Sequence, residues 1–160
     1  MKAGRDVPAE KIGVYFTLQE MMVTSTGLPN VPDAAARSNL VELVRVALDP
    51  LREHLARPVR VRSGFRTPQV NKAVGGSPTS AHKDGAAADI KVDGLTAVEL
   101  VEAILLADID FDQVIAYSTT RGGHVHIGIK PGASARHRKQ ILWAPTEGGY
   151  VTFDRAPRAP

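Results

Sequence analysis

The sequence contains no cysteine among its 160 residues. Disulfide bonds, thiolate nucleophiles, and zinc or iron–sulfur sites built on cysteine are therefore excluded. Any metal ion that this chain holds must be bound by His, Asp or Glu side chains.

Long apolar runs are also missing. No stretch approaches the roughly 18 apolar residues of a membrane-spanning helix, so we expect no membrane span. Lys2 and Arg5 lie near the N-terminus, but the apolar stretch that a signal peptide would need is interrupted. The interrupting residues are Asp6, Pro8, Glu10 and Lys11. We expect the protein to be made in the cytoplasm without an export signal.

The length and composition predict one globular domain. A chain of 160 residues is close to the roughly 150 residues of an average domain and can bury a sizeable core. Hydrophobic residues at 43% and charged residues at 23% exclude collagen-like, disordered and coiled-coil chains. The net charge of +3 permits an acidic partner but does not identify one. We expect residues 1–153 to form the domain and residues 154–160 a flexible tail.

Apolar spacing predicts a long helix early in the chain. Pro32 and Asp33 suit a helix start, and apolar residues then recur at helical spacing. These residues are Leu40, Val44, Ala47, Leu48, Leu51 and Leu55. Pro50 is expected to kink or restart the helix because proline has no amide proton to donate.

Capping residues predict two more helices. Thr67 followed by Pro68 suits an N-cap and a first helical position, with a short helix through Val74. Thr96 with Glu99 three residues later forms a capping-box pattern ahead of an apolar run, which indicates a second helix.

Five segments have the composition or alternation of strands: 59–62, 86–92, 114–117, 124–129 and 140–143. The third and fourth should pair across the polar turn 118–123. Helices come first and strands mixed with helices follow, which favours an α+β fold over a doubly wound sheet. We expect a single domain with a small antiparallel sheet, helices packed on one face and a polar cleft on the other.

Polar side chains on the segment 80–92 are expected to converge. Ala88, Ile90 and Val92 form one apolar strand face, which leaves Asp89 on the opposite face. Gly85 permits a sharp reversal between His82 and the strand, so that the imidazole and the Asp89 carboxylate can meet.

The segment 124–129 has the same alternation. Val125, Ile127 and Ile129 should face the core, which places His124 and His126 on the polar face. Two histidines and one carboxylate, with a fourth position open for water, form the arrangement that zinc hydrolases use to attack an amide. Taken alone, His-x-His on a strand is more often at the surface or beside a ligand, and Asp89 alone could be an ordinary carboxylate.

Four motifs carry a resemblance to a known family: Ser63-Gly64-Phe65-Arg66-Thr67-Pro68-Gln69-Val70-Asn71, Ala73-Val74-Gly75-Gly76-Ser77, Ser80-x-His82-x-x-Gly85-x-Ala87-x-Asp89 and Phe111-Asp112-Gln113-Val114-Ile115. Together with the strand that ends in His126, they resemble the zinc D-Ala-D-Ala carboxypeptidase family over about residues 16–129. The similarity is to its bacteriophage peptidoglycan peptidases, and it implies the family's D,D-peptidase, or hedgehog-like, fold.

The resemblance implies a role for several residues. His82, Asp89 and His126 would bind one zinc ion per chain. Arg66 matches an arginine that holds the substrate or stabilises the oxyanion, although it could form a structural salt bridge instead. Ser80 matches a serine that either binds substrate or orders the loop.

The chain departs from the family pattern where a general base is expected. Several branches place Asp, Glu or His three residues before the last ligand, and Gly123 stands there in this chain. His124 replaces a tryptophan and could act as an acid or base, bind substrate or only support its neighbours. Tyr117 replaces an acidic residue and is expected in the core rather than the cleft. Gln113 is a candidate substrate-binding residue with the same alternative.

The leading hypothesis is a zinc peptidase that hydrolyses peptide bonds of bacterial peptidoglycan, either a carboxypeptidase or an endopeptidase. The resemblance suggests a phage or prophage endolysin, expected as a monomer, which acts on the cell wall after release or as part of a phage particle. The alternative is a non-catalytic zinc-containing module that binds the wall, which Gly123 would explain.

Other functions have less support. The basic run 136–139 could bind an anionic wall polymer or nucleic acid, but a solvated face is favoured and no nucleic-acid partner is expected. Motifs for a serine-hydrolase elbow, a His-Glu-x-x-His helix and a phosphate loop are missing. His54 is assigned to the surface and Trp143 to the core.

Overall fold

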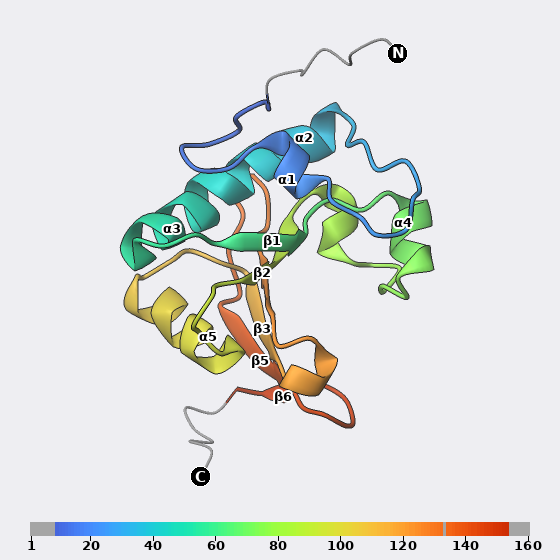
Figure 1. Cartoon of the computed structure of the whole chain (residues 1–160). Helices are drawn as coiled ribbons and strands as arrows, with labels where there is room; N and C mark the ends of the chain where they lie inside the picture. Colours follow the sequence, from blue (N-terminus) through green and yellow to red (C-terminus); the bar gives the residue numbers. More distant parts are fainter. Residues whose placement is uncertain (1–8, 133, 154–160) are drawn as a thin grey trace, which may run out of the picture.

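The computed structural model describes residues 9–132 and 134–153, so the expected tail at 154–160 lies outside the described residues. Its strands form one sheet in the order β1-β2-β4-β3-β5-β6 (Figure 1). The strands are β1 (Arg60–Ser63), β2 (Ala87–Lys91), β3 (Gln113–Tyr117), β4 (Val125–Gly128), β5 (Gln140–Ala144) and β6 (Val151–Thr152). The helices are α1 (Leu18–Met21), α2 (Ala34–Leu43), α3 (Asp49–Leu55), α4 (Pro68–Ala73) and α5 (Ala97–Leu106). Shorter turns are the π-helical η1 (Val44–Leu48) and the 3₁₀-helical η2 (Ala81–Asp84) and η3 (Thr119–Arg121).

The α+β class is confirmed, but the sheet is mixed rather than antiparallel throughout. β3 and β5 run parallel, while every other neighbouring pair is antiparallel. The order of strands explains the difference, because β2 and β3 already occupy both edges of β4. The next strand, β5, joins the free edge of β3. Since β4 ends where β3 begins, a strand that starts there runs parallel to β3.

Alternation along the central strands separates a core face from a polar face. Buried residues of one face join the helices in a single hydrophobic core, among them Ala88, Ile90, Val114, Ala116, Val125 and Ile127. α3 and α5 contact each other, and α5 packs against β3 and β4 from the same side of the sheet (Figure 1). The expected arrangement, with helices on one face, is confirmed. The opposite face is free to carry polar side chains.

The predicted helix starts are confirmed. The side chain of Asp33 accepts a hydrogen bond from the Ala36 amide at 2.8 Å, and α2 begins directly after it. The helix then widens into the π-helical turn η1, and α3 begins one residue before Pro50. The wider turn accommodates the missing amide proton of proline. Thr67 caps α4, and Thr96 with Glu99 forms the predicted capping box of α5.

One α-helix and one strand of the described residues were not predicted. α1 is a single turn with its own capping box between Thr17 and Glu20, a signal that the sequence contains. β6 has only two residues and depends on pairing with β5. As expected, His54 is exposed and Trp143 packs against the core. Within the described ranges, no helix is long and apolar enough to cross a membrane.

Candidate metal centre

The sheet aligns the polar residues in one row. Asp89 on β2 lies directly opposite His126 on β4 in the antiparallel register, and Ser63 on β1 lies opposite Asp89 on its other side. His82 reaches this row from η2 through Gly85, which has a φ of +69°. A Cβ atom on Gly85 would lie 2.4 Å from the Ala36 carbonyl oxygen, so only glycine fits there.

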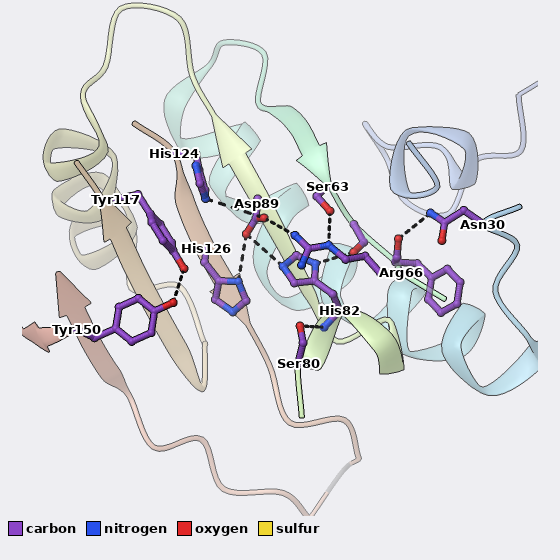
Figure 2. Close-up of polar contacts among 12 residues, drawn as sticks. Asn30, Ser63, Arg66, Ser80, His82, Asp89, Tyr117, His124, His126 and Tyr150 are labelled. Atoms are coloured by element: carbon purple, nitrogen blue, oxygen red, sulfur yellow. Dashed lines mark hydrogen bonds and ion pairs between the residues drawn. The ribbon is translucent and has the colours of Figure 1, made fainter. Parts of the chain in front are cut away.

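His82, Asp89 and His126 converge on one point of the polar face (Figure 2). One Asp89 oxygen, Oδ1, lies 3.2 Å from Nε2 of His82 and 3.1 Å from Nδ1 of His126. One potential ligand atom from each residue lies within 4.8 Å of the other two. The predicted ligand set is therefore assembled, with a neighbouring cleft through which a ligand could enter.

The hydrogen-bond partner of His82 shows why a cation fits this position. Nδ1 of His82 lies 2.6 Å from the carbonyl oxygen of Gly64, which can only accept, so Nδ1 carries the proton. In the neutral imidazole, Nε2 then presents a lone pair toward the carboxylate oxygen Oδ1. Two acceptors that face each other need a proton or a metal ion between them. Two imidazoles and one carboxylate match the donor set that zinc prefers.

The charge states of the group also suit a metal. Burial raises the pKa of Asp89, but its contacts with His126 and His82 outweigh this effect and hold the pKa well below its usual value. Burial lowers the pKa of His126. The carboxylate is therefore ionised and the His126 imidazole is neutral near neutral pH, which is the state that binds a metal ion.

Arg66 holds the second oxygen of Asp89. Its Nη2 atom donates to Oδ2 of Asp89 at 3.0 Å, and its Nε atom donates to the Ser63 hydroxyl at 2.9 Å. The salt bridge considered from the sequence is thus present, and it leaves Oδ1 for a metal ion. Within the described residues, Nη1 of Arg66 has no hydrogen-bond partner, and Arg66 lines the cleft. The structure therefore allows Arg66 to bind both Asp89 and a ligand.

A buried asparagine, which the sequence did not indicate, fixes the backbone around Arg66. Nδ2 of Asn30 donates to the Phe65 carbonyl at 2.9 Å, and its Oδ1 accepts from the Thr67 amide at 2.9 Å. The Arg66 amide itself donates to the His82 carbonyl at 3.0 Å. Asn30 therefore orients Arg66 through hydrogen bonds to the backbone of the residue on each side of it.

We expect Asn30→Asp to lower the free energy of unfolding by about 2–4 kcal/mol, because buried carbonyls lose their donor and a charge is buried. Urea unfolding at neutral pH measures this change. The matched control is Asn39→Asp, because the Asn39 side chain makes one hydrogen bond within the described residues, to the Asp84 carbonyl, at a more exposed position. Equal losses in the two variants would show that the contacts of Asn30 have no special weight.

The cleft beside the three ligands has a volume of about 840 Å³ and is lined by the other predicted site residues. Ser80 caps η2 by accepting a hydrogen bond from the His82 amide at 3.3 Å, so it orders the loop. Gln113 donates to the side chain of Gln140 at 2.6 Å. Both residues still line the cleft and remain candidates for substrate binding.

His124 lies next to the metal ligands and stacks on Tyr117. The ring centroids are 4.3 Å apart with an angle of 18° between the planes, and Nε2 of His124 is 4.0 Å from Oδ2 of Asp89. The expectation that Tyr117 lies in the core is wrong, because it lines the cleft. β3 alternates, so that Tyr117 shares a face with Gln113, while Val114 and Ala116 face the core.

Two further cleft residues were missed from the sequence. The Tyr150 hydroxyl lies 3.0 Å from the Tyr117 hydroxyl, and the guanidinium carbon of Arg121 lies 5.4 Å from the Tyr117 ring centroid and 5.6 Å from that of Tyr150. Arg121 belongs to the turn between β3 and β4, whereas Tyr150 lies just before β6. No local pattern marks Tyr150, because only the pairing of β5 with β3 brings it here.

The basic run 136–139 is largely paired with acidic groups. Arg138 makes a two-pronged contact with the buried carboxylate of Asp112, with distances down to 2.7 Å. Lys139 and His137 both contact Asp110. The run therefore anchors the segment before β5, which gives the nucleic-acid hypothesis little support.

Comparison with known proteins is consistent with this geometry. A protein-family model described as Peptidase M15 matches residues 14–128, which include all three potential ligands. A search of curated proteins found no match.

Proposed function

Because the chain belongs to the peptidase M15 family, we propose that it is a zinc peptidase that hydrolyses peptide bonds in bacterial peptidoglycan. The observation that carries the proposal is the convergence of His82, Asp89 and His126, whose potential ligand atoms lie within 4.8 Å of one another beside a cleft. A zinc ion bound there would supply a water molecule of lowered pKa and polarise the carbonyl of the scissile bond.

The chain's own residues supply the remaining groups. Gly123 cannot carry a proton, and its φ of +61° places it in the turn before β4. We assign proton transfer to His124, which lies beside the ligand group. Burial lowers the pKa of His124, so its imidazole is unprotonated near neutral pH and can accept a proton. The free Nη1 of Arg66 is assigned to the developing oxyanion.

The finer assignment is a phage or prophage endolysin that reaches the cell wall after release or within a phage particle. The motifs that resemble phage peptidoglycan peptidases support it. Both a carboxypeptidase and an endopeptidase are compatible with a cleft of about 840 Å³, and the products distinguish them.

Mass spectrometry of purified peptidoglycan incubated with the zinc-loaded protein tests the function, with a chelated sample as the control. We expect new peptide termini only when the metal is present. Released D-Ala alone would indicate a carboxypeptidase, and cleavage within the stem or a cross-link an endopeptidase. Zinc bound at one per chain without any new termini would contradict the peptidase and favour the wall-binding module, for which Gly123 is the structural reason.

We expect Arg66→Lys to lower kcat by roughly 100-fold. Lysine keeps the positive charge but has no planar fork, so it cannot hold Ser63, Asp89 and an oxyanion together. Steady-state kinetics measures the change, with zinc content determined in parallel. Arg62→Lys is the matched control, because Arg62 is exposed on the neighbouring strand β1. Unchanged kcat in Arg66→Lys would rule out the assignment.

A further inference from the structure

We propose that Arg121, Tyr117 and Tyr150 form a subsite that binds a carboxylate of the peptide substrate, at the end of the cleft away from Arg66. The proposal deepens the proposed function and rests on it, because it names a feature of the substrate that the same cleft selects. All three residues line the cleft beside the candidate metal centre.

Arg121 is the cation of this subsite, and its charge is not neutralised by the protein. Arg66 is paired with Asp89 and Arg138 with Asp112, but no ion pair to Arg121 occurs in the described part of the chain. The one hydrogen bond that its side chain makes there is from Nη1 to the Pro145 carbonyl, at 3.4 Å. Packing on two aromatic rings holds the guanidinium in place while most of its N–H groups stay available.

The two tyrosines add a further donor. Their hydroxyl groups lie 3.0 Å apart, and in such a pair one hydroxyl donates to the other. The acceptor hydroxyl keeps its own proton for a ligand. Burial and the bond to Tyr150 raise the pKa of Tyr117, so this hydroxyl remains protonated at neutral pH. This end of the cleft thus offers N–H and O–H donors together, which favours an anionic acceptor.

The two tyrosines and Arg66 lie on opposite sides of the candidate metal centre. Ile115 on β3 and Asp89 on β2 both pair with His126 on β4, and Tyr117 lies two residues beyond Ile115. The backbones of Tyr117 and Asp89 are therefore at least two strand spacings apart, roughly 10 Å. Figure 2 shows Tyr117 and Tyr150 on one side of the Asp89–His126 pair and Arg66 on the other. A peptide that crosses β4 along the cleft could therefore place its scissile bond at the candidate metal centre and a carboxylate at Arg121.

Calorimetric titration with soluble stem peptides tests this subsite. The probes are a stem tetrapeptide with free carboxylates and the same peptide with each carboxylate converted in turn to a carboxamide. They are titrated into the zinc-free protein, which binds without turnover, and kcat/KM is measured with the zinc-loaded protein. We compare the parent protein, Arg121→Gln and Arg45→Gln. Arg45 is exposed on η1, so its variant removes the same charge outside the cleft.

We expect Arg121→Gln to weaken binding of the free-carboxylate peptide about 10-fold or more, while Arg45→Gln has no such effect. The carboxamide peptide that lacks the recognised carboxylate should bind the parent protein as weakly as the Arg121→Gln variant binds the free-carboxylate peptide. The Arg121→Gln substitution should not weaken the binding of that carboxamide peptide any further. The proposal would be overturned if the parent protein bound all peptides with equal affinity. It would also be overturned if Arg121→Gln lowered the affinity for every peptide by the same factor. Absence of cleavage by the zinc-loaded parent, with selective binding intact, would instead reject the proposed function.

Discussion

His126→Ala is expected to lose stoichiometric zinc binding and to reduce peptidoglycan hydrolysis to the background level. The variant removes one of the three potential ligands and leaves a single imidazole and the Asp89 carboxylate, which is too few for a stable zinc site in a hydrolase. Zinc content by atomic emission after dialysis and the release of peptide termini measure the two effects. Circular dichroism should show the helices retained, because His126 lies on the polar face of β4 and not in the helical core.

The matched control is His54→Ala, which removes an exposed imidazole from α3 and should keep both zinc and activity. Stoichiometric zinc or hydrolysis at the parental rate in His126→Ala would show that the ligand assignment is wrong.

His124→Phe is expected to lower kcat by roughly 10²–10⁴-fold while the zinc content stays at the parental value. Phenylalanine preserves the stacking on Tyr117 but has no ring nitrogen to carry a proton. Steady-state kinetics on a soluble stem peptide measures kcat and KM separately. A fall in kcat with an unchanged KM separates proton transfer from substrate binding.

Two outcomes would contradict the role of His124. Parental kcat in His124→Phe would mean that another group carries the proton. Loss of zinc together with activity would mean that His124 supports the metal site, as its distance of 4.0 Å from Oδ2 of Asp89 would allow. His137→Phe, at a partly exposed position that contacts Asp110, serves as the control for substitution of an imidazole by a phenyl ring.

Local signals in the sequence were sufficient for most of the secondary structure. Asp33, Thr67 and Thr96 cap helices at the predicted positions, because a side-chain oxygen satisfies backbone amides within three residues. Alternation placed Asp89 and His126 on the polar face, because successive strand residues point to opposite sides. The same alternation in β3 places Tyr117 on the cleft face with Gln113, opposite Val114 and Ala116.

Capping residues and alternation in the sequence were enough to predict the longer helices and the polar faces of β2 and β4, since each depends on contacts within a few residues along the chain. They gave the candidate ligands His82, Asp89 and His126, but the pairing of β2 with β4 brings these residues together. The tertiary structure decided that β5 runs parallel to β3, because strand pairing depends on which edge is free. It also decided that Asn30 bonds the neighbours of Arg66 and that Tyr150 reaches Tyr117. These contacts join residues more than 30 positions apart, and no local spacing specifies them.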